Sequence, residues 1–297
     1  MAPNQAIADS IKISAGDVAV RLMWRRTKIV YDIDPTLMRS LIEMDTTDAL
    51  PGEVLRQLPH PNPMFVFTEG HPFLHKDGAS AVLRAMQVTG RRQDGVLCST
   101  HAEEAGQYQL TFISDILDDK GAVKDIDSVR VSIELDNKSF TIRKMIDDIM
   151  EGYAWEPLLA SSATEADKRS YLEQLAGIGI AHLLYVCSDK ADTVRRPVGR
   201  KPVKKGGQRP PKPVQLHQVG YRIGPAIKSA HERIERERAE GVRTGRKMIP
   251  HVRKAHLHTF RHGKGRALSK VKWLPPIFVN ASGEQLDLNG VIIPVQR

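Results

Sequence analysis

The chain has 297 residues, of which 41% are hydrophobic and 27% charged, a balance typical of one large or two ordinary soluble domains. Its first twenty residues lack the basic start and apolar run of a secretory signal, and its longest apolar run, 175–186, is too short to span a bilayer. Two distant cysteines, Cys98 and Cys187, exclude a disulfide framework and a zinc site built from thiols alone. We therefore expect a cytoplasmic protein with no membrane partner.

The net charge of +9 conceals an uneven distribution. Residues 190–270 contain 23 Lys+Arg and 5 Asp+Glu, which leaves 21 Lys+Arg and 30 Asp+Glu in the rest of the chain. An acidic body is thus followed by a strongly basic segment. Clustering of this size indicates a polyanionic partner, most simply RNA, with DNA a weaker candidate. The alternative is intramolecular, with the basic segment neutralising the acidic body.

The first elements are short and mixed. Residues 27–33 have strand composition, Asp34-Pro35 opens a helix that reaches Met44, a second helix covers 51–58, and 64–68 form a buried strand. Between 81 and 135, four strand-like segments separated by short polar turns predict an antiparallel meander: 82–89, 95–101, 108–116 and 129–135. The acidic turn near Asp118 lacks the spacing of a calcium loop, and we expect it to be solvated.

Two helices are expected to complete the body. Residues 139–153 carry an apolar stripe at helical spacing, with Ser139 as N-cap. Residues 164–186 form a longer helix capped by Thr164, and Gly177 and Gly179 within it indicate close backbone packing or a bend. The second half of this helix is apolar nearly all round, so we expect it to be the central core helix.

The composition changes abruptly after residue 188. Residues 189–213 combine prolines, glycines and cations, which predicts a flexible basic linker or an arm that becomes ordered on a partner. A strand over 214–222 and an exposed helix over 223–239 follow, and 285–295 supply a last short strand. The expected fold class is α+β, with a mixed N-terminal body containing an antiparallel sheet and core helices (1–188), the linker (189–213) and a basic C-terminal β-hairpin module (214–297).

The chemistry-bearing residues concentrate between 250 and 280, where four of the eleven histidines fall within twelve residues. Strict alternation over 252–262 predicts a strand with Lys254, His256, His258 and His262 on one face and His251 and Arg253 on the other. Gly263 and Gly265 favour a turn into a second strand near 269–274. The result would be a β-hairpin on which imidazoles and cations share a surface suited to phosphate.

Four uses of this hairpin stay open. It could bind RNA without chemistry, or cleave RNA without a metal, with His256 and His258 as general acid and base. The histidines could also be structural. Zinc binding is disfavoured, because His251 lies on the other face and no acidic residue lies nearby in the sequence to orient the ligands; no metal or other cofactor is expected. The predicted RNA contacts are the basic residues of the hairpin and the linker: His251, Arg253, Lys254, Arg261, Lys264, Lys270, Lys272, Arg195 and Arg196.

Several of these positions resemble a known family, the translation-coupled type V-A anti-CRISPR proteins of phages and plasmids. The resemblance is strongest over 195–280, in Arg196-Pro197, in the segments Gln218-Val219-Gly220 and Arg222-Ile223-Gly224, and in Pro250, His251, Arg253, His256, His258, Trp273, Pro275, Phe278, Val279 and Asn280. Two positions depart from the family pattern. Leu257 stands where the family has tryptophan, and Phe260 where it has tyrosine.

The resemblance implies a mobile-element counter-defence protein that acts in the bacterial cytoplasm. Proteins of this family recognise a nascent polypeptide during its translation, and recognition leads to loss of the mRNA that encodes an effector nuclease. We expect the N-terminal body to recognise the nascent polypeptide and the basic module to contact the mRNA or the ribosome. The competing function, a DNA-binding regulator, is disfavoured because the basic region contains no helix-turn-helix pattern.

Overall fold

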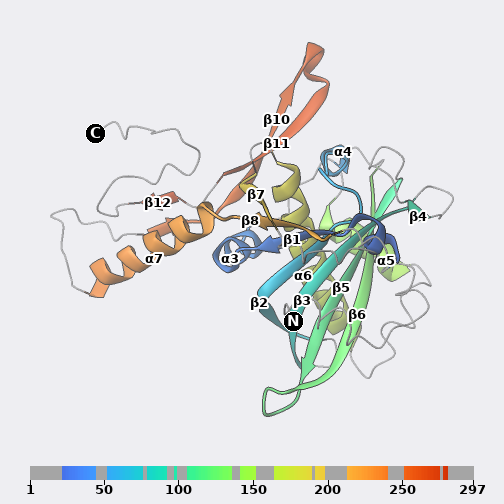
Figure 1. Cartoon of the computed structure of the whole chain (residues 1–297), viewed down its shortest axis with the longest axis horizontal. Coiled ribbons are helices and arrows are strands. Elements are labelled where there is room, and N and C mark those ends of the chain that lie inside the picture. Colours follow the sequence, from blue (N-terminus) through green and yellow to red (C-terminus); the bar gives the residue numbers. More distant parts are fainter. Residues whose placement is uncertain are drawn as a thin grey trace, which may run out of the picture.

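A computed structural model describes residues 22–44, 52–75, 79–91, 97–98, 106–135, 141–151, 164–188, 191–197, 213–239, 251–274 and 277–279. It confirms the α+β class: helices cover one large sheet, and a two-stranded ribbon projects from the body (Figure 1). Among the described residues, no helix is both long and apolar enough to cross a membrane. The predicted strands at 95–101 and 285–295 fall largely or wholly outside the described residues.

The central sheet is mixed. Its strand order is β6-β5-β3-β2-β1-β8-β7, with the short β4 (Leu97–Cys98) paired to β3. The antiparallel meander predicted between 81 and 135 is confirmed in β3 (Ser80–Arg91), β5 (Gln107–Leu117) and β6 (Val123–Glu134), and β2 (Met64–Leu74) adds a further antiparallel strand to it. No partner was predicted for β1 (Ile29–Ile33), which pairs in parallel with both neighbours. Parallel neighbours need a crossover, and α3 (Pro35–Ile42) and α4 (Gly52–Leu55) lie in the connection from β1 to β2.

One long helix, α6 (Glu165–Cys187), packs on this sheet as the central core helix. Thr164 caps it as predicted, in a capping box with Asp167. Gly179 lies directly against the sheet, and a Cβ there would be too close to it, at 2.7 Å from Leu110 Cδ1 and 2.8 Å from Phe112 Cζ. The predicted close backbone packing is therefore confirmed at this glycine.

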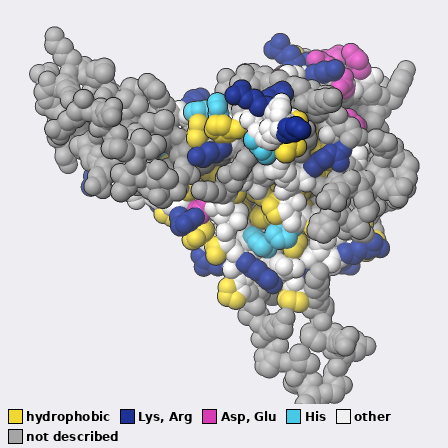
Figure 2. Space-filling view, turned by 90° about the horizontal axis from the view of Figure 1, so that it is seen from above, with side chains coloured by type: hydrophobic (Ala, Val, Ile, Leu, Met, Phe, Trp, Pro, Cys, Tyr) yellow, Lys and Arg dark blue, Asp and Glu magenta, His cyan; other side chains and the backbone are white. Residues whose placement is uncertain are grey.

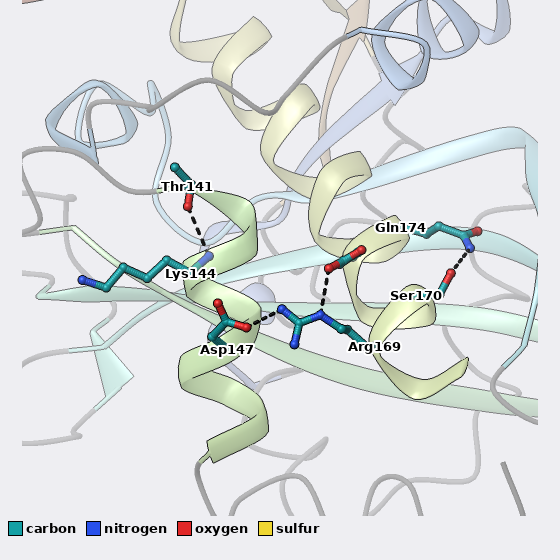
Figure 3. Close-up of polar contacts among 7 residues, drawn as sticks. Thr141, Lys144, Asp147, Arg169, Ser170 and Gln174 are labelled. Atoms are coloured by element: carbon teal, nitrogen blue, oxygen red, sulfur yellow. Dashed lines mark hydrogen bonds and ion pairs between the residues drawn. The ribbon is translucent and has the colours of Figure 1, made fainter. Parts of the chain in front are cut away.

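A second helix, α5 (Ile142–Glu151), is fastened to α6 by one arginine. Arg169 of α6 reaches between the two helices to the carboxylate of Asp147 on α5, and its Nε donates to Glu173 Oε1 at 3.2 Å (Figure 3). At the start of α5, the Lys144 N–H donates to Thr141 Oγ1 at 3.1 Å. Thr141 thus provides the side-chain cap that had been predicted for Ser139, a residue outside the described part.

The sheet continues into residues predicted to lie outside the body. β7 (Thr193–Arg196) pairs antiparallel with β8 (Gln215–Val219), and β8 pairs in parallel with β1. The flexible-linker prediction is therefore wrong for Thr193–Arg196, which is the edge strand of the large sheet. Backbone pairing with β8 explains the difference, because it satisfies the polar groups of the short strand, and the Arg196 side chain also bonds to Gln218 of β8. Residues 198–212 of the predicted linker lie outside the described part of the chain.

The helix after β8, α7 (Ile223–Ala239), begins at a carboxylate from a distant part of the chain. Asp192 is 1% exposed, and its Oδ2 accepts from the backbone N–H groups of Arg222 at 2.8 Å and Ile223 at 3.0 Å. Its Oδ1 accepts from Arg222 Nε at 2.9 Å. Gly224 is required beside this junction, because a Cβ there would lie 1.9 Å from Asp34 Oδ1.

The ribbon consists of two ladders that share one register. β10 (His256–His262) pairs with β11 (Leu268–Leu274), confirming the predicted hairpin and its second strand. β9 (His251–Arg253) pairs with β12 (Ile277–Val279), and extending the register outward from the pair His256–Leu274 by three positions gives the observed pair Arg253–Ile277. The single strand predicted over 252–262 is thus interrupted at 254–255. In the sequence, the two residues between β11 and β12 are Pro275 and Pro276, and proline has no N–H to donate to a ladder.

Candidate nucleic-acid interface

The ribbon is anchored at its base. Ala255, between β9 and β10, is 2% exposed and belongs to the hydrophobic core, and the strand β11 contacts α4 and α6. From this base β10 and β11 extend away from the body to the turn at Lys264–Arg266 (Figure 1). Gly263 and Gly265 adopt positive φ angles of 79° and 66° in this turn, which confirms why glycine is needed there. The geometry presents both strands to solvent on a fixed support.

The register places His256 and His258, the predicted catalytic pair, on one face together with two of the predicted binding residues, Lys270 and Lys272. His256, His258, Phe260 and His262 occupy alternate positions of β10, where successive positions point to opposite faces. The positions paired with them on β11 are Leu274, Lys272, Lys270 and Leu268, in that order. We call these eight positions the imidazole face. The backbone register therefore brings imidazole positions of β10 and lysine positions of β11 to one face.

Every histidine on this face is exposed. The side chains of His256, His258 and His262 are solvent-accessible, Lys272 is half-buried, and Phe260 is 43% exposed. The ring of His258 meets the ring of Phe260 edge-on, with centroids 4.3 Å apart. In the part of the chain that is described, neither His256 nor His258 hydrogen bonds to a carboxylate. The ring that packs against His258 is a phenyl group, which has no polar atom to fix the tautomer of the imidazole.

The remaining predicted contacts are distributed around this face. Lys254 is exposed at the base, Lys264 at the tip, and Arg261 on β10 at a position of the opposite face. His251 and Arg253 belong to β9, and Lys270 pairs with Phe260; their side chains lie outside the described part. No Asp or Glu occurs between Glu240 and Glu284, so the sequence supplies no counter-charge to the ribbon from within its own segment. Figure 2, seen from the side on which the ribbon projects, shows Lys, Arg and His side chains over much of the described surface, with acidic ones gathered mainly at one corner.

Arg195 and Arg196 lie on the edge strand β7 and not on the ribbon. Arg195 pairs in register with His217, which pairs with Tyr31, so the three form a row across β7, β8 and β1. Arg196 is on the other face, where its Nε donates to Gln218 Oε1 at 2.8 Å. The side chains of Arg195 and Arg196 therefore lie on opposite faces of the sheet and do not form one site.

Beside Arg195 lies a ring cluster that sequence reasoning missed. The Tyr31 hydroxyl is hydrogen bonded to His60 Nδ1 at 2.7 Å, and the rings of His60 and His217 have centroids 4.5 Å apart. Burial lowers the pKa of His217, and the charges of His60 and Arg195 lower it further. A neutral imidazole here acts as packing for the row. Nothing local in the sequence signals this cluster, because its members come from three separate segments.

The acidic turn and the buried histidine near the meander have structural roles. The acidic turn is exposed, and Asp118 Oδ1 accepts from the N–H groups of Lys120 and Ala122. His75 is 8% exposed and pairs with Asp127 at 2.9 Å, which joins the ends of β2 and β6. Among the described residues, no group of three or more His, Cys, Asp or Glu side chains is placed to hold a metal ion.

Comparison with known proteins adds the family. No curated protein matches the chain. The model of the anti-CRISPR type V subtype A2 family matches residues 31–281, from the first strand of the sheet to just beyond the last strand of the ribbon. This match extends the resemblance seen over 195–280 to nearly the whole body. The chain belongs to the anti-CRISPR type V subtype A2 family, whose role is counter-defence.

Proposed function

We propose that this anti-CRISPR protein acts on a translating mRNA, with the ribbon as its RNA or ribosome contact and the sheet-and-helix body as the part that recognises the nascent polypeptide. The observation that carries the RNA half is the imidazole face: exposed imidazoles and lysine positions on a projecting, anchored ribbon whose segment lacks acidic residues. Such a surface fits the phosphate backbone, which dominates affinity for nucleic acids.

The peptide half of the proposal rests on the resemblance to translation-coupled proteins. The body is acidic overall, which separates its surface chemistry from that of the ribbon. A division of labour follows naturally, because the ribbon can meet RNA while the body stays free for a polypeptide. The target would be the transcript of a type V-A effector nuclease.

Binding is favoured over catalysis by the surroundings of the two histidines. His256 and His258 are two residues apart on one strand, which places their Cα atoms roughly 7 Å apart, a span compatible with one phosphodiester. A general base normally needs a partner that fixes its tautomer and orientation, and no described carboxylate bonds to either ring. We therefore propose that the face grips RNA and leaves cleavage to host nucleases.

The test uses the purified full chain and a labelled single-stranded RNA in EDTA, with the His256→Ala/His258→Ala variant beside the wild type. We expect binding that weakens with salt and no cleavage by either protein. Cleavage by the wild type that the variant lacks would replace the docking role with a metal-independent ribonuclease. Absence of binding would overturn the RNA contact, and tighter binding to duplex DNA than to RNA would favour the regulator hypothesis instead.

A further inference from the structure

The imidazole face carries an apolar feature that phosphate binding does not need. Five large hydrophobic side chains of the described part are exposed, and two of them, Phe260 at 43% and Leu268 at 57%, belong to this face. Phe260 is the only aromatic among the five. An exposed phenyl ring on a face that also carries lysine positions suits a partner that is both anionic and flat.

We propose that the ribbon binds single-stranded RNA by stacking an unpaired base on the Phe260 ring. This inference rests on the proposed function and specifies the form of RNA that the ribbon takes. The rings of His258 and Phe260 meet edge to face, with centroids 4.3 Å apart, so the imidazole packs against one part of the phenyl ring. Edge-to-face contact leaves an exposed aromatic surface available to a base.

Phosphate contacts fall at the right places for a stacked nucleotide. In the register Lys270 is paired with Phe260, and Lys272 with His258. Paired positions of neighbouring strands lie about 5 Å apart, so the backbone brings a lysine position next to each of the two ring positions. A base on Phe260 would therefore have its own phosphate, or the next one, within reach of a lysine. Stacking combined with a cationic track is the general design of surfaces that hold single strands.

Duplex RNA does not fit this arrangement. In an A-form helix the base faces are stacked on one another, and the major groove is too deep and narrow for side chains to read. A phenyl ring can then touch only sugar and phosphate, where it contributes little. The aromatic ring therefore selects unpaired nucleotides, as in a translated stretch of mRNA, whereas the lysines alone would bind any phosphate backbone.

The test measures fluorescence anisotropy of a labelled twelve-nucleotide RNA, once as a single strand and once annealed to its complement. The full chain is compared with Phe260→Ala, Phe260→Leu and Phe260→Trp. Phe260→Leu is the matched control, because it keeps apolar bulk and loses the π face. We expect both Phe260→Ala and Phe260→Leu to weaken single-strand binding about tenfold, Phe260→Trp to retain it, and duplex binding to be the same for all four proteins.

A second readout distinguishes this inference from the proposed function. With 2-aminopurine in the RNA, binding to the wild type should change its fluorescence relative to the free strand, and binding to Phe260→Leu should not. If Phe260→Leu binds RNA and changes the fluorescence like the wild type, stacking is overturned while the RNA contact stands. If the wild type binds neither RNA, the proposed function fails with it. Because Phe260 is exposed, unchanged circular dichroism spectra should confirm that each variant is folded.

Discussion

At the scale of single residues, the core contains an imidazole that cannot be charged without cost. His182 on α6 is fully enclosed, its Nδ1 is hydrogen bonded to the Ile178 carbonyl at 2.7 Å, and its ring lies edge-on to Phe67. Burial lowers the pKa of His182 to about 4, against the favourable effect of the Ile178 carbonyl. The folded protein therefore holds this side chain neutral at pH values where the unfolded chain would protonate it.

This difference predicts a loss of stability in mild acid. Above pH 6.5 the imidazole is neutral in both states; between pH 6.5 and 4 the unfolded chain binds a proton that the folded protein does not, so the free energy of unfolding falls as the pH falls. Between pH 7 and pH 5, we expect the free energy of unfolding of His182→Leu to fall by about 2 kcal/mol less than that of the wild type. Urea unfolding at the two pH values measures this. Equal losses in the two proteins would contradict the assignment.

At the scale of elements, α7 depends on a cap that is remote in sequence. Asp192 accepts from two backbone N–H groups at the start of α7 and from the Arg222 guanidinium, and its carboxylate is 0% exposed. The pKa of Arg222 is raised by this hydrogen bond and charge. These bonds fix the start of α7 to the residue that directly precedes β7.

Removing this cap should destabilise the whole fold. Asp192→Ala leaves the buried N–H of Ile223 and the partly buried N–H of Arg222 without their acceptor, and we expect a loss of about 2–3 kcal/mol in the free energy of unfolding. The matched control is Asp118→Ala, because Asp118 also accepts from two backbone N–H groups but in an exposed turn. There water can replace the carboxylate, and the loss should stay below about 1 kcal/mol. Comparable losses for the two variants would show that burial of Asp192 is not what matters.

Local pattern predicted most elements, because their signals lie within a few residues. The capping box at Thr164, the helix Ile223–Ala239 and the strand Leu268–Leu274 are examples. Pairing partners were harder to predict. The insertion of β8 between β1 and β7 is decided by contacts across nearly two hundred residues, and the cap at Asp192 has no local motif.

For the candidate site too, local features could be predicted from the sequence, and features that depend on distant pairing could not. Period-two alternation gave the imidazole face, since side-chain parity follows from the strand alone. The interruption at 254–255 has no local signal in the strand's own sequence and becomes visible only from the pairing of β9 with β12. The divergence of Arg195 and Arg196 required knowing that they are strand residues.

At the scale of the molecule, the charge division coincides with a division of shape. The acidic part of the sequence builds most of the covered sheet, whereas the basic segment supplies the projecting ribbon (Figure 1). The salt dependence of RNA binding, which comes from counterions released from the RNA, should therefore depend on the lysines of the ribbon. For single strands the slope of log affinity against log salt changes by about 0.7 for each phosphate contact.

We expect Lys264→Ala/Lys272→Ala to reduce the magnitude of that slope by about 1 to 1.5, and to weaken RNA binding at low salt. The control, Lys120→Ala/Lys124→Ala, removes two exposed lysines, one in the turn between β5 and β6 and one at the start of β6, and should leave the slope unchanged. Anisotropy titrations over a range of salt concentrations give both numbers. Equal effects of the two variants would indicate a diffuse response to net charge instead of a site.

The central claim, action on a translating mRNA through the ribbon, is tested most directly in cells. The measurement is the level of a transcript encoding a type V-A effector nuclease, with and without its start codon, in cells that express the wild type, Lys264→Ala/Lys272→Ala or Lys120→Ala/Lys124→Ala. We predict that the wild type and the control variant lower the translated transcript only, and that the ribbon variant lowers neither. An equal fall of the untranslated transcript, or full activity of the ribbon variant, would contradict the account.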